Sequence, residues 1–219
     1  MPPAPAPSPD PLLTALRRHR LVAILRTRTE APLLDVIRVL ADAGVRIVEV
    51  TVPTPGSTGA IRTAAAELGP EVLVGAGTVT RAEEVTRTAE AGGRFIVCPH
   101  TDPALIGAAR AAGLGSLPGA YTPTEALTAW RCSASAVKIF PASQLGPRYV
   151  ADLAAPLPDL PVVPTGGVEV CDIAPYREAG ATAVAVSSPL IGDALAGGSL
   201  AELHRRARRY VHAAEGAPV

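Results

Sequence analysis

Residues 46–51 read RIVEVT, a run of aliphatic residues interrupted by a single carboxylate. Short, nearly continuous aliphatic runs are typical of strands that are buried on both faces of a parallel sheet. Seven similar runs are found outward from this one, and the eight begin about every 21–26 residues. The other seven cover residues 21–25, 72–75, 94–98, 115–118, 136–140, 161–165 and 183–187, with 115–118 the weakest.

Patterns typical of helices fill the intervals between these runs. Residues 30–43 carry a stripe of apolar side chains and stop at Gly44, and glycine readily adopts the left-handed conformation that ends a helix. Residues 80–91 begin with Thr-x-x-Glu, a capping-box pattern, and stop at Gly92. Further helices are expected over residues 9–19, 122–130, 146–153, 170–179 and 200–213.

Eight strand–helix units predict an α/β protein built as a single (β/α)8 TIM-type barrel, which we expect over residues 9–214. The extra N-terminal helix should cover the bottom of the barrel. An open doubly wound sheet is the alternative, but it would need a glycine-rich fingerprint after the first strand, and RTRTEA follows Leu25. Residues 1–8 are expected to form a disordered Pro/Ala tail and residues 215–219 a short C-terminal tail.

Composition excludes several classes of protein. Of 219 residues, 48% are hydrophobic, so a large core can form, and a formal charge of zero favours neither nucleic acid nor an anionic membrane as a partner. No apolar run approaches the roughly 20 residues that cross a bilayer. The three cysteines form no CxxC pair and no metal-ligand pattern with the four histidines, so we expect no metal, no disulfide framework and a cytoplasmic location.

Lys138 is the only lysine among 20 basic residues, and it lies inside the run over residues 136–140. If its side chain points into the barrel, burial lowers its pKa and favours the free amine, which can attack a carbonyl. The alternative is a lysine whose side chain reaches outward to solvent. Glu49, inside the run over residues 46–51, could pair with Lys138 or move protons at a reacting carbon, unless it lies on an exposed strand edge.

Active sites of such barrels lie at the carboxyl ends of the strands, which directs attention to the loops after the last two runs. The first loop contains Gly166 and Gly167, whose backbone can approach a phosphate closely, and the second offers the hydroxyls of Ser187 and Ser188. Phosphate sites recur at these two loops of the fold. Plain tight turns and helix caps are the alternative explanation.

Six segments carry a resemblance to a known family: EVTVPTPG, VGAGTV, FIVCPH, LPGAYTPTE, VKIFPAS and VPTGGV, in this order. From about residue 20 to residue 190 the chain resembles the class I 2-keto-3-deoxy-6-phosphogluconate (KDPG) and 4-hydroxy-2-oxoglutarate aldolases. The resemblance implies a homotrimeric barrel that needs no metal or other cofactor. It implies a Schiff base at Lys138, acid/base catalysis by Glu49 partly through water, a pyruvate site at Thr78, and a phosphate site at Gly166, Gly167 and Ser188. Pro99 and Thr165, at the ends of two further runs, complete the expected substrate-binding residues.

Two departures from the family pattern bear on the substrate. Pro53 stands where many members carry an arginine that holds the pyruvate carboxylate, and we expect Arg26 to take its place, because a guanidinium can bind a carboxylate through two hydrogen bonds. Ser187 stands where glycine is usual, and it either crowds a phosphate or adds a donor.

The expected function is a class I aldolase that cleaves a 2-keto-3-deoxy sugar acid, foremost KDPG, reversibly to pyruvate and glyceraldehyde 3-phosphate. The alternatives are an aldolase for 4-hydroxy-2-oxoglutarate or 2-keto-3-deoxy-6-phosphogalactonate, another phosphosugar epimerase or isomerase, and a non-catalytic barrel that binds a sugar phosphate.

Overall fold

The computed structural model describes residues 10–216. The expected N-terminal tail, residues 1–8, lies outside the described residues, as do residues 217–219 of the C-terminal tail. Helix α10 (Leu200–Glu215) includes the first residue assigned to that tail.

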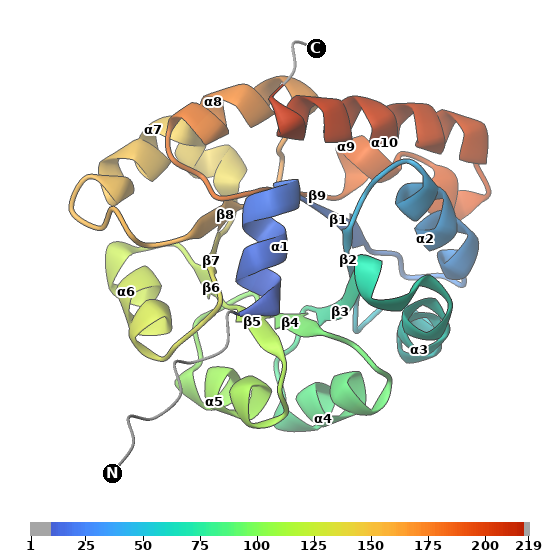
Figure 1. Ribbon diagram of the computed structural model, residues 1–219, viewed down its shortest axis with the longest axis horizontal. Helices are drawn as coiled ribbons and strands as arrows, with labels where there is room; N and C mark the ends of the chain where they lie inside the picture. Colours follow the sequence, from blue (N-terminus) through green and yellow to red (C-terminus); the bar gives the residue numbers. More distant parts are fainter. Residues whose placement is uncertain (1–9, 217–219) are drawn as a thin grey trace, which may run out of the picture.

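Every strand pairing in residues 10–216 is parallel, and the strands curl into a ring surrounded by helices (Figure 1). One sheet has the order β5-β4-β3-β2-β1-β9 and the other the order β6-β7-β8. A bridge between Thr165 and Ala185 links the end of β8 to β9. The first strand therefore lies between the second and the last, an arrangement that the order 3-2-1-4-5-6 of a classical open sheet does not produce. The strands are β1 (Leu21–Leu25), β2 (Ile47–Thr51), β3 (Leu73–Gly77), β4 (Phe95–Val97), β5 (Gly115–Leu117), β6 (Gly119–Ala120), β7 (Val137–Ile139), β8 (Val162–Pro164) and β9 (Val184–Val186).

Each of the eight predicted runs contains a strand, but the structure has one more strand than the sequence predicted, after the run over residues 115–118. Residues 115–118 form β5 up to Leu117, and Pro118 then separates it from β6. Proline has no amide hydrogen to donate to a strand ladder, so the pairing changes at that point. As a result β5 pairs with β4, whereas β6 pairs with β7.

Helices follow the strands around the outside of the ring (Figure 1). Besides α1 (Pro11–His19), which precedes the first strand, the helices are α2 (Leu33–Asp42), α3 (Ser57–Leu68), α4 (Ala82–Glu90), α5 (Pro103–Ala111), α6 (Pro123–Arg131), α7 (Ala142–Ala154), α8 (Ile173–Glu178), α9 (Ser188–Ile191) and α10, with short 3-10 turns at Gly69–Glu71, Val170–Asp172 and Ala194–Ala196. Helices α3 and α5 were not expected from the sequence, because their many Ala, Gly and Thr residues weaken the hydrophobic period.

Two expected helix starts are corrected by the structure. The capping carboxylate of α4 is Glu84 rather than Glu83, since Glu84 Oε2 accepts from the Thr80 and Arg81 amides at 2.7 and 3.1 Å. Helix α7 begins at Ala142 rather than at Gly146, and Gly146, with φ of 70°, interrupts it. Helix α6 also begins with a capping box, in which the Glu125 amide donates to Thr122 Oγ1 at 3.3 Å.

The side chains of each strand alternate between two apolar layers. Those facing outward pack beneath the helices, and those facing inward form a second cluster that includes Leu12 and Leu16 of α1. Helix α1 therefore lies across one end of the ring, as Figure 1 shows. The inward strand residues of this cluster are Val22, Ile24, Ile47, Leu73, Phe95, Val97, Leu117, Ala136, Val163, Ala183 and Ala185.

Candidate active site

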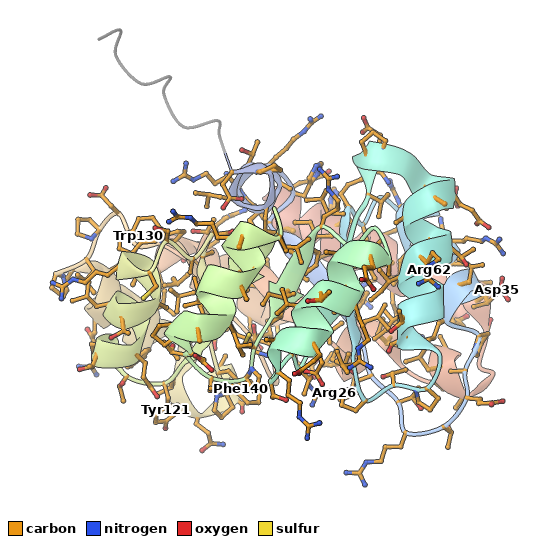
Figure 2. The ribbon with its side chains drawn as sticks, turned by 90° about the horizontal axis from the view of Figure 1, so that it is seen from below. Arg26, Asp35, Arg62, Tyr121, Trp130 and Phe140 are labelled. Atoms are coloured by element: carbon orange, nitrogen blue, oxygen red, sulfur yellow. The ribbon has the colours of Figure 1, made fainter. Side chains whose placement is uncertain are left out.

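Lys138 and Glu49 both lie on the inward face of the ring. In β2, Glu49 is two residues from the inward Ile47, and in β7, Lys138 is two residues from the inward Ala136, so strand alternation turns both side chains inward. They are 1% and 3% exposed. Glu49 is the central residue of β2 and Lys138 the central residue of β7, and the carboxyl ends of the strands lie at the end of the ring opposite α1. Figure 2 shows this end, with Arg26 and Phe140 labelled, opposite the helix.

Burial drives both groups toward their neutral forms. Desolvation lowers the pKa of the Lys138 amine, and the Glu49 carboxylate only partly opposes that shift. Desolvation likewise raises the pKa of Glu49, against the opposing effects of Lys138 and Arg26. The Lys138 nitrogen also lies 4.7 Å from the centre of the Phe140 ring. A lowered pKa increases the fraction of free amine, which is the form of lysine that acts as a nucleophile.

Glycine at position 77 makes room for Glu49. A Cβ atom built on Gly77 in β3 would overlap Oε1 and Cδ of Glu49 and lie 2.5 Å from its Cγ. The Glu49 side chain therefore runs across β3 against bare backbone. Oε1 has no hydrogen-bond partner within the described residues, so a group inside the ring could bond to it.

Arg26 reaches across the end of β2 to β3. Its Nη2 donates to Thr78 Oγ1 at 3.3 Å, and its charge influences the pKa values of both Glu49 and Lys138. Thr78 has φ of 59°, which is uncommon for a β-branched residue. Backbone of this kind persists where surrounding structure over-determines it, and it is often found at ligand sites.

The loops expected to bind phosphate lie beside one another. Thr165 is buried and bridges to Ala185 of β9, and Gly166 and Gly167 follow it with φ of 94° and 72°. A Cβ atom on Gly167 would lie 2.7 Å from Ser143 Cβ, so α7 closes against this loop.

Ser187 and Ser188 join Arg26 in lining a cavity of about 200 Å³. The hydroxyl of Ser187 donates to Ile24 O at 3.1 Å, which ties the start of α9 to β1, whereas Ser188 is exposed. The structure thus brings Arg26, which is predicted to bind the carboxylate, and two of the residues predicted to bind phosphate, Ser187 and Ser188, to one cavity.

Pro99 lies farther around the ring, after β4. It is half-buried, and its carbonyl packs against Gly119 at the start of β6. The same strand end contains Cys98, whose pKa burial raises to about 12, so its thiol stays protonated and unreactive.

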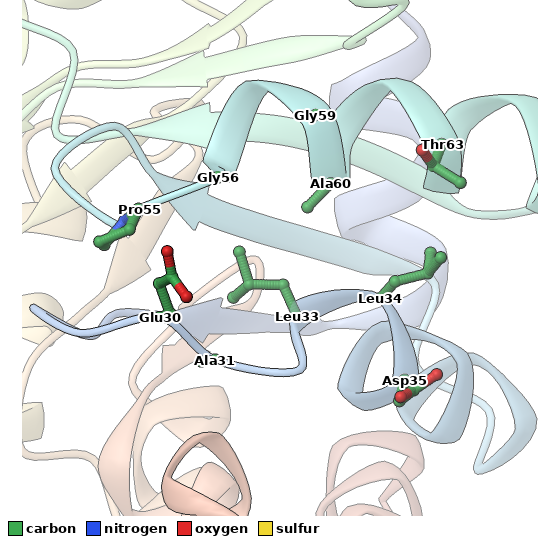
Figure 3. Close-up of a pocket in the computed structure, with 10 residues that line it drawn as sticks. All are labelled: Glu30, Ala31, Leu33, Leu34, Asp35, Pro55, Gly56, Gly59, Ala60 and Thr63. Atoms are coloured by element: carbon green, nitrogen blue, oxygen red, sulfur yellow. The ribbon is translucent and has the colours of Figure 1, made fainter.

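A second cavity, of about 420 Å³, lies between the starts of α2 and α3 (Figure 3). Leu33 and Leu34 line one side of this cavity and Gly59 and Ala60 line the other, and Glu30 lies in the loop that precedes α2. None of the predicted site residues lines this cavity, so the buried Lys138 and Glu49 identify the candidate site better than volume does.

Gly77, Thr54 and Phe140 were missed as site residues by sequence reasoning. Gly77 could have been found, because a glycine with inward alternation beside a strand that carries a buried carboxylate implies a close approach. No sequence signal marks the contacts of Thr54, which depend on the packing of two loops. Among residues 10–216, no cluster of three or more His, Cys, Asp or Glu side chains is arranged to hold a metal ion. No helix in this part of the chain combines the length and hydropathy needed to cross a bilayer.

A buried amine and a buried carboxylate inside a ring of parallel strands can serve an α/β enzyme as a nucleophile and as an acid/base group. Comparison with known proteins shows that the enzyme is a lyase, an aldolase. The family model described as "KDPG and KHG aldolase" matches residues 13–205. The chain belongs to this family.

Three relatives illustrate the match. A probable 2-dehydro-3-deoxy-6-phosphogalactonate aldolase of Rhizobium meliloti (strain 1021) is 36% identical, over 82% of this chain and 85% of the relative. A 2-dehydro-3-deoxy-phosphogluconate aldolase of Treponema pallidum (strain Nichols) is 32% identical, over 75% and 79%. A solved structure described as "Native KDPGal structure" superposes with a TM-score of 0.82 at 35% identity, over 88% and 93% of the two chains.

Proposed function

We propose that this aldolase works through a Schiff base at Lys138 and cleaves a 2-keto-3-deoxy-6-phospho sugar acid to pyruvate and glyceraldehyde 3-phosphate. The observation that carries the proposal is the position of the only lysine in the chain, buried inside the ring with a carboxylate whose charge acts on it. An epimerase, an isomerase or a binding protein for the same phosphosugars would have no need of a buried amine. Consistent with the family, we propose that the strands close into a complete eight-stranded barrel over residues 9–214 and that three copies associate.

The proposed reaction begins when the neutral Lys138 amine attacks the C2 carbonyl. The carbinolamine loses water to give an iminium ion, with Glu49 supplying and accepting the protons. The C4 hydroxyl then loses its proton to Glu49 or to a water bonded to it. The electrons of the C3–C4 bond flow toward the iminium, the aldehyde leaves, and an enamine of pyruvate remains. Protonation at C3 and hydrolysis by water release pyruvate and the free amine, so one difficult cleavage is divided into easier steps.

The remaining predicted residues have proposed roles in binding. Arg26, with Thr78, would hold the carboxylate of the keto acid, because Pro53 stands at the position where an arginine was expected to do so. The backbone amides of Gly166 and Gly167 and the hydroxyls of Ser187 and Ser188 would bind the phosphate, and Thr165 and Pro99 would line the cavity between. Arg26, Ser187 and Ser188 line the same cavity, which supports a binding site for an anionic substrate there.

The gluconate and galactonate acids differ in configuration at C4, which becomes trigonal on cleavage, so both give the same products. We place the galactonate epimer before the gluconate epimer as substrate, because the relative named a probable 2-dehydro-3-deoxy-6-phosphogalactonate aldolase is 36% identical and the Treponema relative, named a 2-dehydro-3-deoxy-phosphogluconate aldolase, is 32% identical. Measurement of kcat/KM on both epimers and on 4-hydroxy-2-oxoglutarate tests this order. A higher kcat/KM on the gluconate epimer or on 4-hydroxy-2-oxoglutarate than on the galactonate epimer would contradict it.

Borohydride trapping tests the mechanism. Pyruvate and borohydride should add a reduced pyruvyl group to Lys138, identified by peptide mass spectrometry, and to no other residue. Lys138→Arg should fold but neither trap nor cleave, because a guanidinium remains protonated. An active wild-type chain in which Lys138 stays unmodified would exclude the Schiff base.

A further inference from the structure

A network of three threonines connects the loop after β2 to the loop after β1. Thr51 and Thr54 are 1% and 2% exposed, and their hydroxyls lie 2.8 Å apart. Thr54 Oγ1 also accepts from the backbone amide of Thr27 at 3.2 Å. The residue next to Thr27 is Arg26, so this hydrogen bond fixes the backbone from which the Arg26 side chain extends.

The segment that carries Thr54 is rigid. Thr54 lies between Pro53 and Pro55, and proline fixes its own φ and restricts the residue before it. The Thr54 amide donates to Thr51 O at 2.9 Å, and its carbonyl accepts from the Ser57 amide at 3.1 Å. Both backbone groups of Thr54 and its hydroxyl thus form hydrogen bonds, which restrain the position of its side chain.

Arg26 itself has little else to hold it. Its side chain is exposed, and in residues 10–216 its only side-chain hydrogen bond is the one to Thr78 Oγ1, at the long distance of 3.3 Å. A long exposed side chain loses considerable conformational entropy when it is held in one place. A fixed backbone at the base of the side chain reduces the volume that the guanidinium samples, and it favours positions near Thr78.

We propose that Thr54 is a positioning residue, which holds the Thr27 amide and thereby aims Arg26 at the carboxylate of the keto acid. Pro53 contributes to this positioning, because it stiffens the segment that carries Thr54. The inference rests on the function proposed above and deepens it, because it concerns how that site recognises a 2-keto carboxylate.

Thr54→Val tests the inference, because valine keeps the shape and removes the hydroxyl. We expect KM for the keto acid to rise about three- to tenfold, the effect of one lost hydrogen bond, with kcat within about twofold of wild type. Thr54→Ser keeps the hydroxyl and should restore KM. Thr88→Val is the matched control: Thr88 is also buried, and its hydroxyl donates to Glu84 O within α4, so it should leave KM unchanged.

The double variant separates positioning from general loss of stability. In an Arg26→Ala background, Thr54→Val should raise KM less than twofold further, because the side chain that Thr54 aims is gone. A three- to tenfold rise in KM on adding Thr54→Val to the Arg26→Ala background would overturn the inference, and so would an unchanged KM in Thr54→Val alone. In either case the proposed function would stand, provided that Arg26→Ala still weakened binding. A wild-type chain that cleaves no keto acid would overturn both proposals.

Discussion

The contact between Gly77 and Glu49 predicts that Gly77→Ala impairs the enzyme through a residue on another strand. The new Cβ would overlap Oε1 and Cδ of Glu49 and lie 2.5 Å from Cγ, whereas ordinary contact begins at 3.4 Å. Cγ alone must therefore move by about 0.9 Å, the difference between these distances. Glu49 is 1% exposed, so the buried atoms around it restrict where its side chain can move.

Two magnitudes follow from this displacement. Overpacking of a buried site typically costs about 1–3 kcal/mol of stability, which corresponds to a fall in Tm of about 2–12 °C in a domain of this size. A catalytic group misplaced by about 1 Å can lose about 100-fold in rate, so kcat should fall by about one to two orders of magnitude. Trapping of pyruvate at Lys138 should continue, but more slowly, because the amine itself is not displaced.

The assay is pyruvate release, measured with a coupled dehydrogenase, together with thermal unfolding of the same samples. Gly107→Ala in α5 is the matched control, because nothing lies within 4 Å of a Cβ at that position and its φ is not positive. Alanine in a helix should leave kcat unchanged there and raise stability by about 0.5–1 kcal/mol. If Gly77→Ala retained wild-type kcat and Tm, the placement of the Glu49 carboxylate against β3 would be wrong.

Three further predictions concern charge. Burial raises the pKa of Glu49 above its ordinary 4.5, so the folded chain keeps that proton in a pH range where the unfolded chain has lost it. The stability of the wild type relative to Glu49→Gln should therefore fall as pH rises from about 4.5 toward 7. Denaturant unfolding at several pH values that shows no such fall would contradict the raised pKa. Arg26→Ala should raise the activation free energy that corresponds to kcat/KM by about 1.5–3 kcal/mol, the scale of hydrogen bonds to a charged group, and Arg28→Ala should not. Equal kcat/KM values in the two variants would show that Arg26 does not bind the carboxylate. Ser188→Asp should abolish a preference for the phosphorylated acid of about tenfold or more over its unphosphorylated analogue, and a preserved preference would place the phosphate elsewhere.

Much of the fold could be predicted from the chain because the patterns that specify it are local. Each aliphatic run indicates a strand through its own burial, and each glycine or capping carboxylate marks a helix end through its own backbone geometry. The failures have the same origin: α3 and α5 contain too many small residues to show a period, and the run that ends at Pro118 gave no sign of the separate strand β6 that follows it and pairs with β7.

Within the candidate site, the sequence by itself determined which residues are out of place. An ionisable side chain inside an aliphatic strand must be neutral or paired, which singles out Lys138 and Glu49 without any knowledge of the tertiary structure. Only the tertiary structure decided the exact contacts around them: the overlap that a Cβ on Gly77 would make with the carboxylate, and the anchoring of the Arg26 loop by Thr54. The physical reason is that a strand's burial follows from its own side chains, whereas contacts between residues 27 positions apart depend on register and on the curvature of the whole ring.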